Sequence, residues 1–415
     1  MTSTGATPYG TIIDEFAVVA TDHPCENELG GAAYATRSLL ASRPEDALRR
    51  ERLDGRLRSF GAGADRSTFR DGPGILLAHM SWFASVAPAL LLHEGYMVDP
   101  AAEGAAEIEK LRVDLGDRFW AVSPELWNAW GTKGPFRRRC RDLLGDLSVP
   151  PGVEFTAVEA DDILGHLTSV DSRPAGRSVV KLPGGGGMGN LVLTSDEPEI
   201  WPRRVDVLWE AHRHLPRPVD VVVETWLPWE TTYSVSFLLT PSGASTLLAV
   251  CEQMVDLSEC GWVGSRTDGP LSEADTAAML ACLQPVVDAM TADGYVGVVA
   301  LDVIVGPGDG WRSHGLALPS GQRICVIECN PRFNQHNRTG MVVERLARRW
   351  DMDSRTLSWS LRNVARPDGT ALRDLLTSLE DDRDGYAAPT RDQPARMVFA
   401  HRLDQAMELT VTRAV

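Results

Sequence analysis

The sequence predicts an α/β protein, in the wide sense that includes α+β arrangements, and three observations carry this prediction. Its 415 residues are 43% hydrophobic, which is typical of a globular protein with a sizeable buried core. Apolar runs alternate with stretches of helical periodicity over about the first 120 residues. Further along, Val219–Glu224 is a nearly continuous β-branched run, as in a buried strand. At ~100–200 residues per domain, the length indicates two to four structural units.

The N-terminal part, residues 1–122, is expected to form a small parallel α/β domain. Gly10–Thr21 contains an apolar run typical of a buried strand, and Ala32–Leu40 has helical periodicity. Gly74–Ala78 is a second apolar run that leads into the helix-like stretch Trp82–His93. Alternating strands and helices favour a parallel sheet. No phosphate-binding glycine pattern occurs in this part.

From Pro124 onward the pattern changes to longer helices and paired strands. The Pro150-Pro151 pair forces extended backbone before the next element. The expected helices are Trp127–Leu144, Val205–His214, Ser272–Ala292 and Gly340–Arg349. The expected strands are Val179–Leu182, Leu191–Thr194, Val219–Glu224, Tyr233–Thr240, Ser245–Met254, Val296–Val305, Arg323–Cys329 and a last one near Leu409–Val411.

Charge and cysteine content exclude several classes of function. The formal net charge of −16 disfavours wrapping DNA or coating an anionic membrane. The seven cysteines contain no C-x-x-C pair, which suits reduced thiols better than disulfides or zinc. Residues 1–15 lack a basic segment followed by an apolar one, so no signal peptide is expected. Ile75–Leu92 is interrupted by polar residues and is interpreted as a strand and helix, not a membrane span. We therefore expect a cytoplasmic protein.

Only three of the 41 basic residues are lysines: Lys110, Lys133 and Lys181. A GC-rich genome would explain most of this excess of arginine. Lysine is nevertheless a compact point charge, whereas arginine is a bulky planar fork. The positions of the three lysines are therefore informative.

The strongest local signal is Lys181 followed by the glycine-rich segment Gly184–Gly189. A dinucleotide fingerprint would lie between a strand and a helix, but here strand-like runs lie on both sides. Nor is it a Walker loop, because no Lys-Ser/Thr follows the last glycine. Bare backbone N–H groups beside a lysine can wrap polyphosphate oxygens. A purely structural glycine hairpin is the alternative.

A second constellation consists of Asp302 and the segment Glu328–Arg332. Side chains alternate along a strand, so Glu328 and Asn330 share one face and Cys329 points away. If the strand Val296–Val305 pairs beside it, Asp302 joins them. Two carboxylates and an amide oxygen suit Mg²⁺. Arg332 is placed to stabilise a developing negative charge.

A third element is the end of the β-branched run, from Glu224 to Leu227. An acid leaving an apolar strand, followed by extended backbone, can present carbonyl and N–H groups to an adenine edge. Taken alone, such a residue is more often just the end of a strand.

These motifs, in this order, resemble the ATP-grasp superfamily over about residues 125–345. The family order is an entry lysine, a strand lysine with a glycine-rich loop, a Glu-x-x-Leu hinge, a strand aspartate and Glu-x-Asn-x-Arg. Here these read Lys133, Lys181 with Gly184–Gly187, Glu224–Leu227, Asp302 and Glu328–Arg332. The resemblance implies an ATP-grasp fold with a Rossmann-like pre-ATP-grasp domain at residues 1–122. The ATP-grasp domain would span residues 123–345, with a lid at about 147–222, and residues 346–415 would pack on the core.

The resemblance also implies ligands and roles. The cofactors would be ATP and one or two Mg²⁺ ions, with Mn²⁺ as an alternative metal. ATP phosphates would be bound by Lys133, Lys181 and the backbone of Gly184, Gly185, Gly186 and Gly187. Adenine would be held at Glu224, Thr225, Trp226 and Leu227, and the metal by Asp302, Glu328 and Asn330. The family's ribose acid has no clear match, and Glu230 and Thr232 lie nearest its position. The catalytic candidates are Arg332, Lys181, Arg338 and His336.

The function implied is that of a carboxylate–amine ligase working through an acyl phosphate. The layout looks like amino-acid or peptide ligases of specialised metabolism, including the pheganomycin-type group. Expected partners are small-molecule carboxylates and amines, with neither nucleic acid nor membrane; a homodimer is left open. Another ATP-grasp reaction, carboxylase or kinase-like, is the alternative enzyme, and a catalytically inactive nucleotide sensor is the alternative of a different class. Glu252 and Asp256, expected on a loop, are weaker candidates to receive an amine.

Overall fold

The computed structural model of the chain describes residues 78–79, 93–94, 123–168, 176–183, 190–213, 215, 217–256, 261–311, 314–331, 334–364, 388–391, 393–402 and 405–414. Within the predicted N-terminal domain, two short strands are described, β1 (Ala78–His79) and β2 (His93–Glu94), and they pair in parallel. The other elements expected there lie outside the described residues. No described helix is long and apolar enough to cross a membrane.

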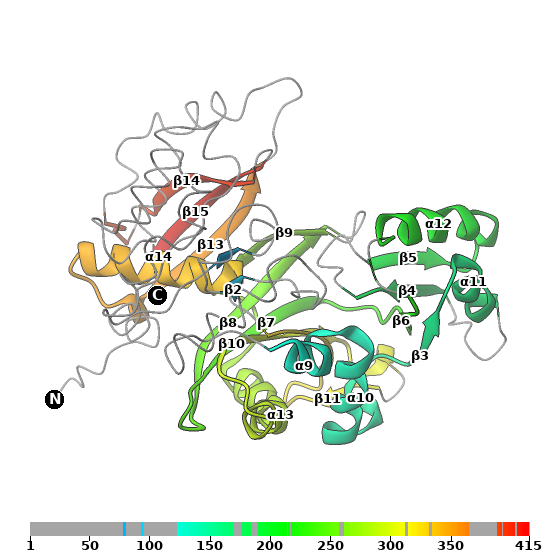
Figure 1. Ribbon diagram of the computed structural model, residues 1–415. Helices are drawn as coiled ribbons and strands as arrows, with labels where there is room; N and C mark the ends of the chain where they lie inside the picture. The colour runs from blue at the N-terminus through cyan, green and yellow to red at the C-terminus, as the bar shows by residue number, and fades with distance from the viewer. Residues whose placement is uncertain are drawn as a thin grey trace, which may run out of the picture.

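A nine-stranded antiparallel sheet forms the centre of the described structure (Figure 1). Its strand order is β11-β12-β10-β7-β8-β9-β13-β15-β14. Strands far apart in the sequence therefore lie side by side: β10 pairs with both β7 and β12, and β13 pairs with β9 and β15. The strands are β7 (Thr231–Leu239), β8 (Ser245–Asp256), β9 (Gly261–Arg266), β10 (Gly297–Gly306), β11 (Leu316–Ala317), β12 (Arg323–Asn330), β13 (Leu357–Val364), β14 (Ala395–Arg402) and β15 (Gln405–Arg413).

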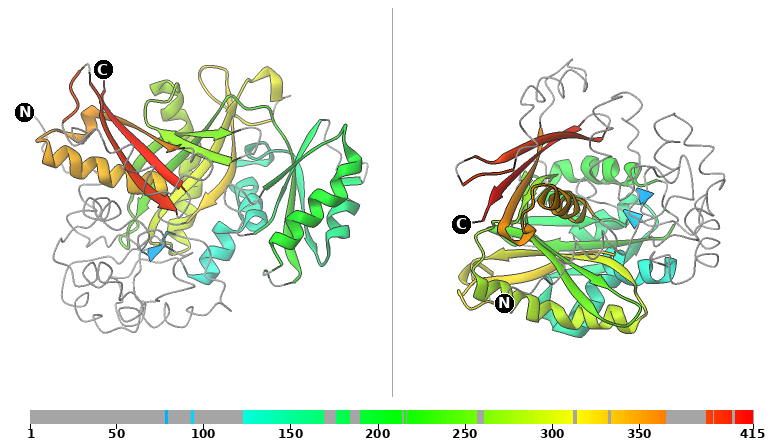
Figure 2. Two further views of the ribbon diagram at one scale, coloured as in Figure 1. Left: turned by 90° about the horizontal axis from the view of Figure 1, so that it is seen from above. Right: turned by 90° about the vertical axis from the view of Figure 1, so that its left-hand side faces the viewer.

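A separate four-stranded antiparallel sheet, which we call the lid, lies to one side of the large sheet (Figure 2). Its order is β3-β6-β4-β5, and two helices cover one face. Alternation buries Val180, Leu191 and Leu193 beneath these helices in a core of its own. The lid elements are β3 (Gly152–Ala157), α11 (Ala160–Thr168), β4 (Arg177–Lys181), β5 (Asn190–Thr194), α12 (Trp201–Ala211) and β6 (Val219–Thr225).

Helices cover the two faces of the nine-stranded sheet. α13 (Glu273–Ala292) and α10 (Lys133–Leu144) pack on the face that carries Val299 and Leu301. α14 (Gln335–Arg349) packs on the other face, over β8 and β13. α10 also touches β6 of the lid, so this helix bridges the two sheets.

The helix expected at Trp127–Leu144 consists of two segments, and a short helix precedes them. The short α9 (Pro124–Leu126) runs into a π-helical turn, Trp127–Gly131, and α10 starts after extended backbone at Thr132. A Cβ on Gly131 would lie 2.9 Å from the Trp127 ring, so a side chain there would clash. The interruption places Lys133 in the first turn of α10.

Other boundaries differ from the expectation as well. α14 begins at Gln335 and not at Gly340, because Asn334 caps it by accepting a hydrogen bond from the Asn337 N–H. Glu252 and Asp256 both belong to strand β8 and not to a loop, because this strand extends to Asp256. The sequence reasoning missed the strands β2, β3, β9, β11, β13 and β14 and the helices α9 and α11; β2 begins at His93, where the end of a helix was expected.

Candidate nucleotide and metal site

Three basic side chains lie along one face of α10. Lys133, Arg137 and Arg141 are spaced four residues apart, so they lie on one face of the helix, one turn above another. Lys133 and Arg137 are buried, at 7% and 4% exposure, so each needs a charged partner. Their partners are acids on strands of both sheets.

The predicted metal ligands come together where β10 meets β12. Asp302 is directly opposite Glu328 in the register, and the Asn330 amide Nδ2 donates to Asp302 Oδ2 at 2.9 Å. Lys133 forms an ion pair with Glu328. Cys329 is buried in the core on the opposite face, as the alternation predicts.

The donor set fits Mg²⁺ better than a transition metal. Within the described ranges, no cluster of three or more His, Cys, Asp or Glu side chains is suited to hold a metal. Two carboxylates and one amide are instead the sparse oxygen set that Mg²⁺ uses while it keeps several waters and bridges phosphates. Asp302, Glu328 and Asn330 are therefore the residues that would hold it.

The second lysine is at the end of β4 and contacts the end of β6. Lys181 Nζ lies 2.5 Å from Glu224 Oε2 and donates to the Ile327 carbonyl of β12 at 3.2 Å. Lys181 is 6% exposed and Glu224 4% exposed. The lid lysine thus reaches both the hinge acid and the strand that carries the predicted metal ligands.

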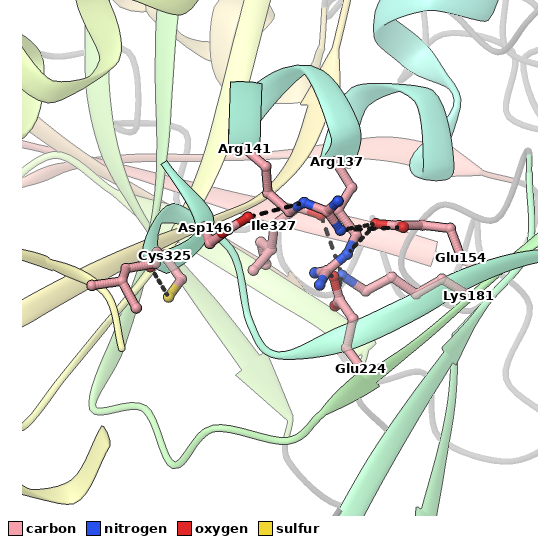
Figure 3. A network of polar contacts seen from close by, with 9 residues as sticks. Arg137, Arg141, Asp146, Glu154, Lys181, Glu224, Cys325 and Ile327 are labelled. Atoms are coloured by element: carbon pink, nitrogen blue, oxygen red, sulfur yellow. Dashed lines mark hydrogen bonds and ion pairs between the residues drawn. The ribbon is translucent and has the colours of Figure 1, made fainter. Parts of the chain in front are cut away.

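Arg137 completes a network that sequence reasoning missed (Figure 3). Its Nη1 donates to Glu224 Oε1 at 2.9 Å, and its Nε donates to Glu154 Oε1 of β3 at 2.6 Å. Arg141 Nη1 reaches both oxygens of Glu154, at 3.2 and 3.3 Å. The spacing of Lys133, Arg137 and Arg141 was the available signal, hidden within a run of arginines.

An apolar cluster lies beside the hinge. Leu227, Ile304, Trp311 and Cys325 are buried together, with the partly buried Ile327 against them. Trp311 Nε1 donates to the Pro228 carbonyl at 2.5 Å, which fixes the hinge against the large sheet. Flat apolar walls beside backbone polar groups are what an adenine ring requires.

Backbone hydrogen bonds restrict which hinge groups can face a ligand. The Thr225 N–H donates to the Pro151 carbonyl at 2.7 Å, and the Trp226 N–H donates to the backbone carbonyl of Arg177 at 2.9 Å. These two N–H groups hold the lid together. The N–H groups of Thr225 and Trp226 are therefore not available to a base at the hinge.

The ribose candidates lie at the start of β7. Glu230 is exposed, and its Oε2 accepts a hydrogen bond of 2.6 Å from Gln322 Nε2. Thr232 is buried and donates to the Gln253 carbonyl at 3.1 Å. Glu230 is thus the more accessible of the two.

The catalytic candidates after β12 lie in or before the first turn of α14. His336 is 6% exposed, and its ring centroid lies 6.1 Å from that of Trp262. Arg338 is in the same turn, but its side chain is not described. Arg332 and the glycines Gly184, Gly185, Gly186 and Gly187 lie outside the described residues.

Two buried cysteines have raised pKa values, one beside the hinge and one in the core beneath α14. Burial raises the pKa of Cys325, next to the hinge cluster, far above its ordinary range. Burial likewise raises the pKa of Cys251 to about 12. Because only the thiolate is reactive, burial disfavours either cysteine as a nucleophile near neutral pH. Glu252, the weaker amine candidate, forms an ion pair of 2.7 Å with Arg266.

Comparison with known proteins identifies the fold. No protein-family model matches the chain, and no curated protein sequence is similar to it. Among solved structures, Staphylococcus aureus N5-carboxyaminoimidazole synthetase complexed with ADP matches with a TM-score of 0.53 and 9% identity, over 96% of this chain and 94% of that chain. Rhizobium etli pyruvate carboxylase matches with a TM-score of 0.50 and 13% identity, over 91% of this chain and 30% of that chain. These similarities, together with the lid, the hinge and the large sheet, identify the chain as a protein with the ATP-grasp fold.

Proposed function

We propose that the protein is an ATP-dependent carboxylate–amine ligase. One observation carries the proposal: Lys133 and Lys181, from α10 and the lid, converge with the acids Glu224, Glu328 and Asp302 between the two sheets. In a chain with only three lysines, two thus lie where phosphates of a bound ATP would need point charges.

In this proposal, the residues mainly position reactants and neutralise charge. Lys133 and Lys181 bind the polyphosphate, and Arg332 meets the transferred phosphoryl group. Asp302, Glu328 and Asn330 hold Mg²⁺, which when bound screens the phosphate charge. The hinge backbone and the cluster around Leu227 and Ile304 hold adenine.

The proposed reaction has two steps. A carboxylate oxygen attacks the γ-phosphorus, the bond to the β-phosphate oxygen breaks, and ADP leaves. The amine nitrogen then attacks the acyl carbon, phosphate departs with the electron pair, and the nitrogen loses a proton. His336 and Arg338, in the first turn of α14, are the candidates to bind substrate carboxylate or phosphate. The expected substrates are amino acids or peptides in specialised metabolism, in the cytoplasm.

A second candidate is the ATP-dependent carboxylation of an amine. It is favoured by the match to the S. aureus synthetase over nearly the full length of both chains. Bicarbonate would then replace the substrate carboxylate. A kinase-like transfer would leave phosphate on the acceptor, and an inactive sensor would bind nucleotide without turnover. Retention of both lysines and all three metal-ligand candidates disfavours the sensor.

One experiment separates these readings. The purified full chain is incubated with Mg·ATP and pooled amino acids, with and without bicarbonate, and ADP, AMP, phosphate and new masses are measured. Ligation requires ADP and phosphate formation that depends on both a carboxylate and an amine. Dependence on bicarbonate and an amine, with no other carboxylate required, would support carboxylation. AMP as the product would exclude the acyl phosphate, and no turnover with any pool would favour the sensor.

A further inference from the structure

The hinge acid Glu224 is held by two cations at once. Lys181 lies on Oε2 at 2.5 Å and Arg137 on Oε1 at 2.9 Å, and all three side chains are buried. Under the proposed function, Lys181 also has to serve the phosphates of ATP. Moving its charge away from a buried carboxylate is costly unless another cation remains there.

Arg137 has the properties of that second cation. It is always charged, and its planar fork spans two carboxylates, Glu224 of β6 and Glu154 of β3. It comes from α10, which packs on β12 and on β6, so its anchor does not belong to the lid. Lys181 instead comes from β4 of the lid and carries its charge on a flexible four-carbon stem.

We propose that Arg137 is a positioning residue that keeps Glu224 charge-compensated and in place, so that Lys181 can turn from Glu224 to a nucleotide phosphate. The inference rests on the proposed nucleotide site. It assigns Arg137 no contact with the substrate or with the reacting atoms. Its effect is transmitted through Lys181.

This role predicts a selective defect. Without Arg137, Lys181 becomes the main partner of Glu224 and is held there. A ligand with phosphates then loses its interaction with Lys181 and binds more weakly, whereas the affinity of a ligand with only adenine and ribose changes little. A role confined to folding or hinge shape would weaken both kinds of ligand equally.

The test compares the affinities of ADP with Mg²⁺ and of adenosine for the full chain by calorimetry. For Arg137→Met we expect ADP affinity to fall about 10- to 100-fold, the range for losing a hydrogen bond to a charged group. Adenosine affinity should change by less than about three-fold. Arg137→Lys should recover part of the ADP affinity, because it keeps the charge but reaches one carboxylate. Arg138→Met, at the exposed neighbouring position, is the matched control and should behave as wild type.

Glu154→Gln keeps the inference falsifiable if Arg137→Met does not fold. Neutralising Glu154 leaves the Arg137 charge to Glu224 alone, so ADP affinity should stay equal or rise. Equal losses of ADP and adenosine affinity in Arg137→Met, or a loss of ADP affinity in Glu154→Gln, would overturn the inference while leaving the nucleotide site in place. If the wild-type protein binds neither ADP nor adenosine, the proposed function fails and this inference fails with it.

Discussion

Lys181 shows why residue type matters in the candidate site. Its ammonium contacts Glu224 Oε2 and the Ile327 carbonyl within a space that leaves the residue 6% exposed. An arginine fork is wider and would have to displace Arg137 or the hinge cluster. A point charge on a flexible stem fits against Glu224 and the Ile327 carbonyl and, under the proposed function, turns towards a phosphate.

The first prediction concerns this lysine. Lys181→Met keeps the apolar stem and removes the charge, while Arg137 still holds Glu224, so the fold should persist. We expect kcat/KM for ATP to fall about 10²-fold or more, as for loss of a preorganised charged donor. Steady-state kinetics measure the fall in kcat/KM, and circular dichroism checks that the fold persists. Arg213→Ala, which removes a surface pair with Glu210, is the control. Wild-type turnover in Lys181→Met would contradict the phosphate role.

At the scale of elements, a glycine sets how closely β3 and β6 approach. Gly152 pairs with Glu224, and a Cβ there would lie 2.2 Å from the Val223 carbonyl oxygen. Gly152→Ala should therefore destabilise the protein by about 1–3 kcal/mol, because the strands must separate. Gly165→Ala is the matched control: this glycine is in α11, and its Cβ would meet no atom within 4 Å. It should stabilise by about 0.5–1 kcal/mol. Urea unfolding measures the free energy of unfolding of both variants. Equal changes in Gly152→Ala and Gly165→Ala would refute the packing argument.

The start of α13 gives a pH-dependent prediction. Asp275 accepts hydrogen bonds from the Ser272 hydroxyl at 2.6 Å and the Ser320 N–H at 2.9 Å, and these hold its pKa below the ordinary value. A lowered carboxyl pKa contributes stability above the unfolded-state pKa of ~3.9, and this is lost as the pH falls through the folded-state pKa. Asp275→Asn should therefore be less stable than wild type by about 1 kcal/mol at pH 7.

Urea unfolding of both proteins at pH 7, 5 and 3.5 tests this sign. The difference in unfolding free energy should be the same at pH 7 and 5 and should narrow at pH 3.5. Ser242→Ala, which removes a hydroxyl from an exposed turn, should show no such pH dependence. A difference that widens on acidification would contradict the assignment.

Elements with one strong pattern could be predicted from the sequence, and elements defined by long-range pairing could not. The β-branched run of β6 and the helix α13 with its Ser272 cap match the expectation closely. β13 carries a period-two pattern, with Leu357, Trp359 and Leu361 buried, which the sequence reasoning overlooked. The start of α14 was missed because its first turn is polar, although His336 and Asn337 in this turn are buried.

The residues of the candidate site were predicted from motifs, but the contacts between their side chains were not. Alternation correctly grouped Glu328 with Asn330, and the β10–β12 register added Asp302. The link from Arg137 to Glu154 and Glu224 joins residues 17 and 87 positions apart. Such a link depends on how α10 is placed between two sheets, which local patterns do not encode.

Across the whole molecule, the site and the C-terminal part of the sheet should contribute separately to stability. Leu409 of β15 is fully buried in a cluster with Trp359 and Met407, away from the lysines and the hinge. Leu409→Ala should destabilise the protein by about 2–5 kcal/mol through lost burial and a cavity. ADP binding adds stability through mass action, about 2.7 kcal/mol at 100 times Kd. Because these two terms involve different contacts, they should add.

Thermal unfolding with and without ADP and Mg²⁺ tests this separation. In wild type, ADP should raise Tm by a few degrees. In Leu409→Ala, Tm should fall without ligand, but the increase on ADP binding should be preserved. In Lys181→Met, the ligand-free Tm should change little and the increase should shrink. If Leu409→Ala abolished the ADP effect, the C-terminal strands would be coupled to the nucleotide site, because only a shared conformational equilibrium could then connect the two regions.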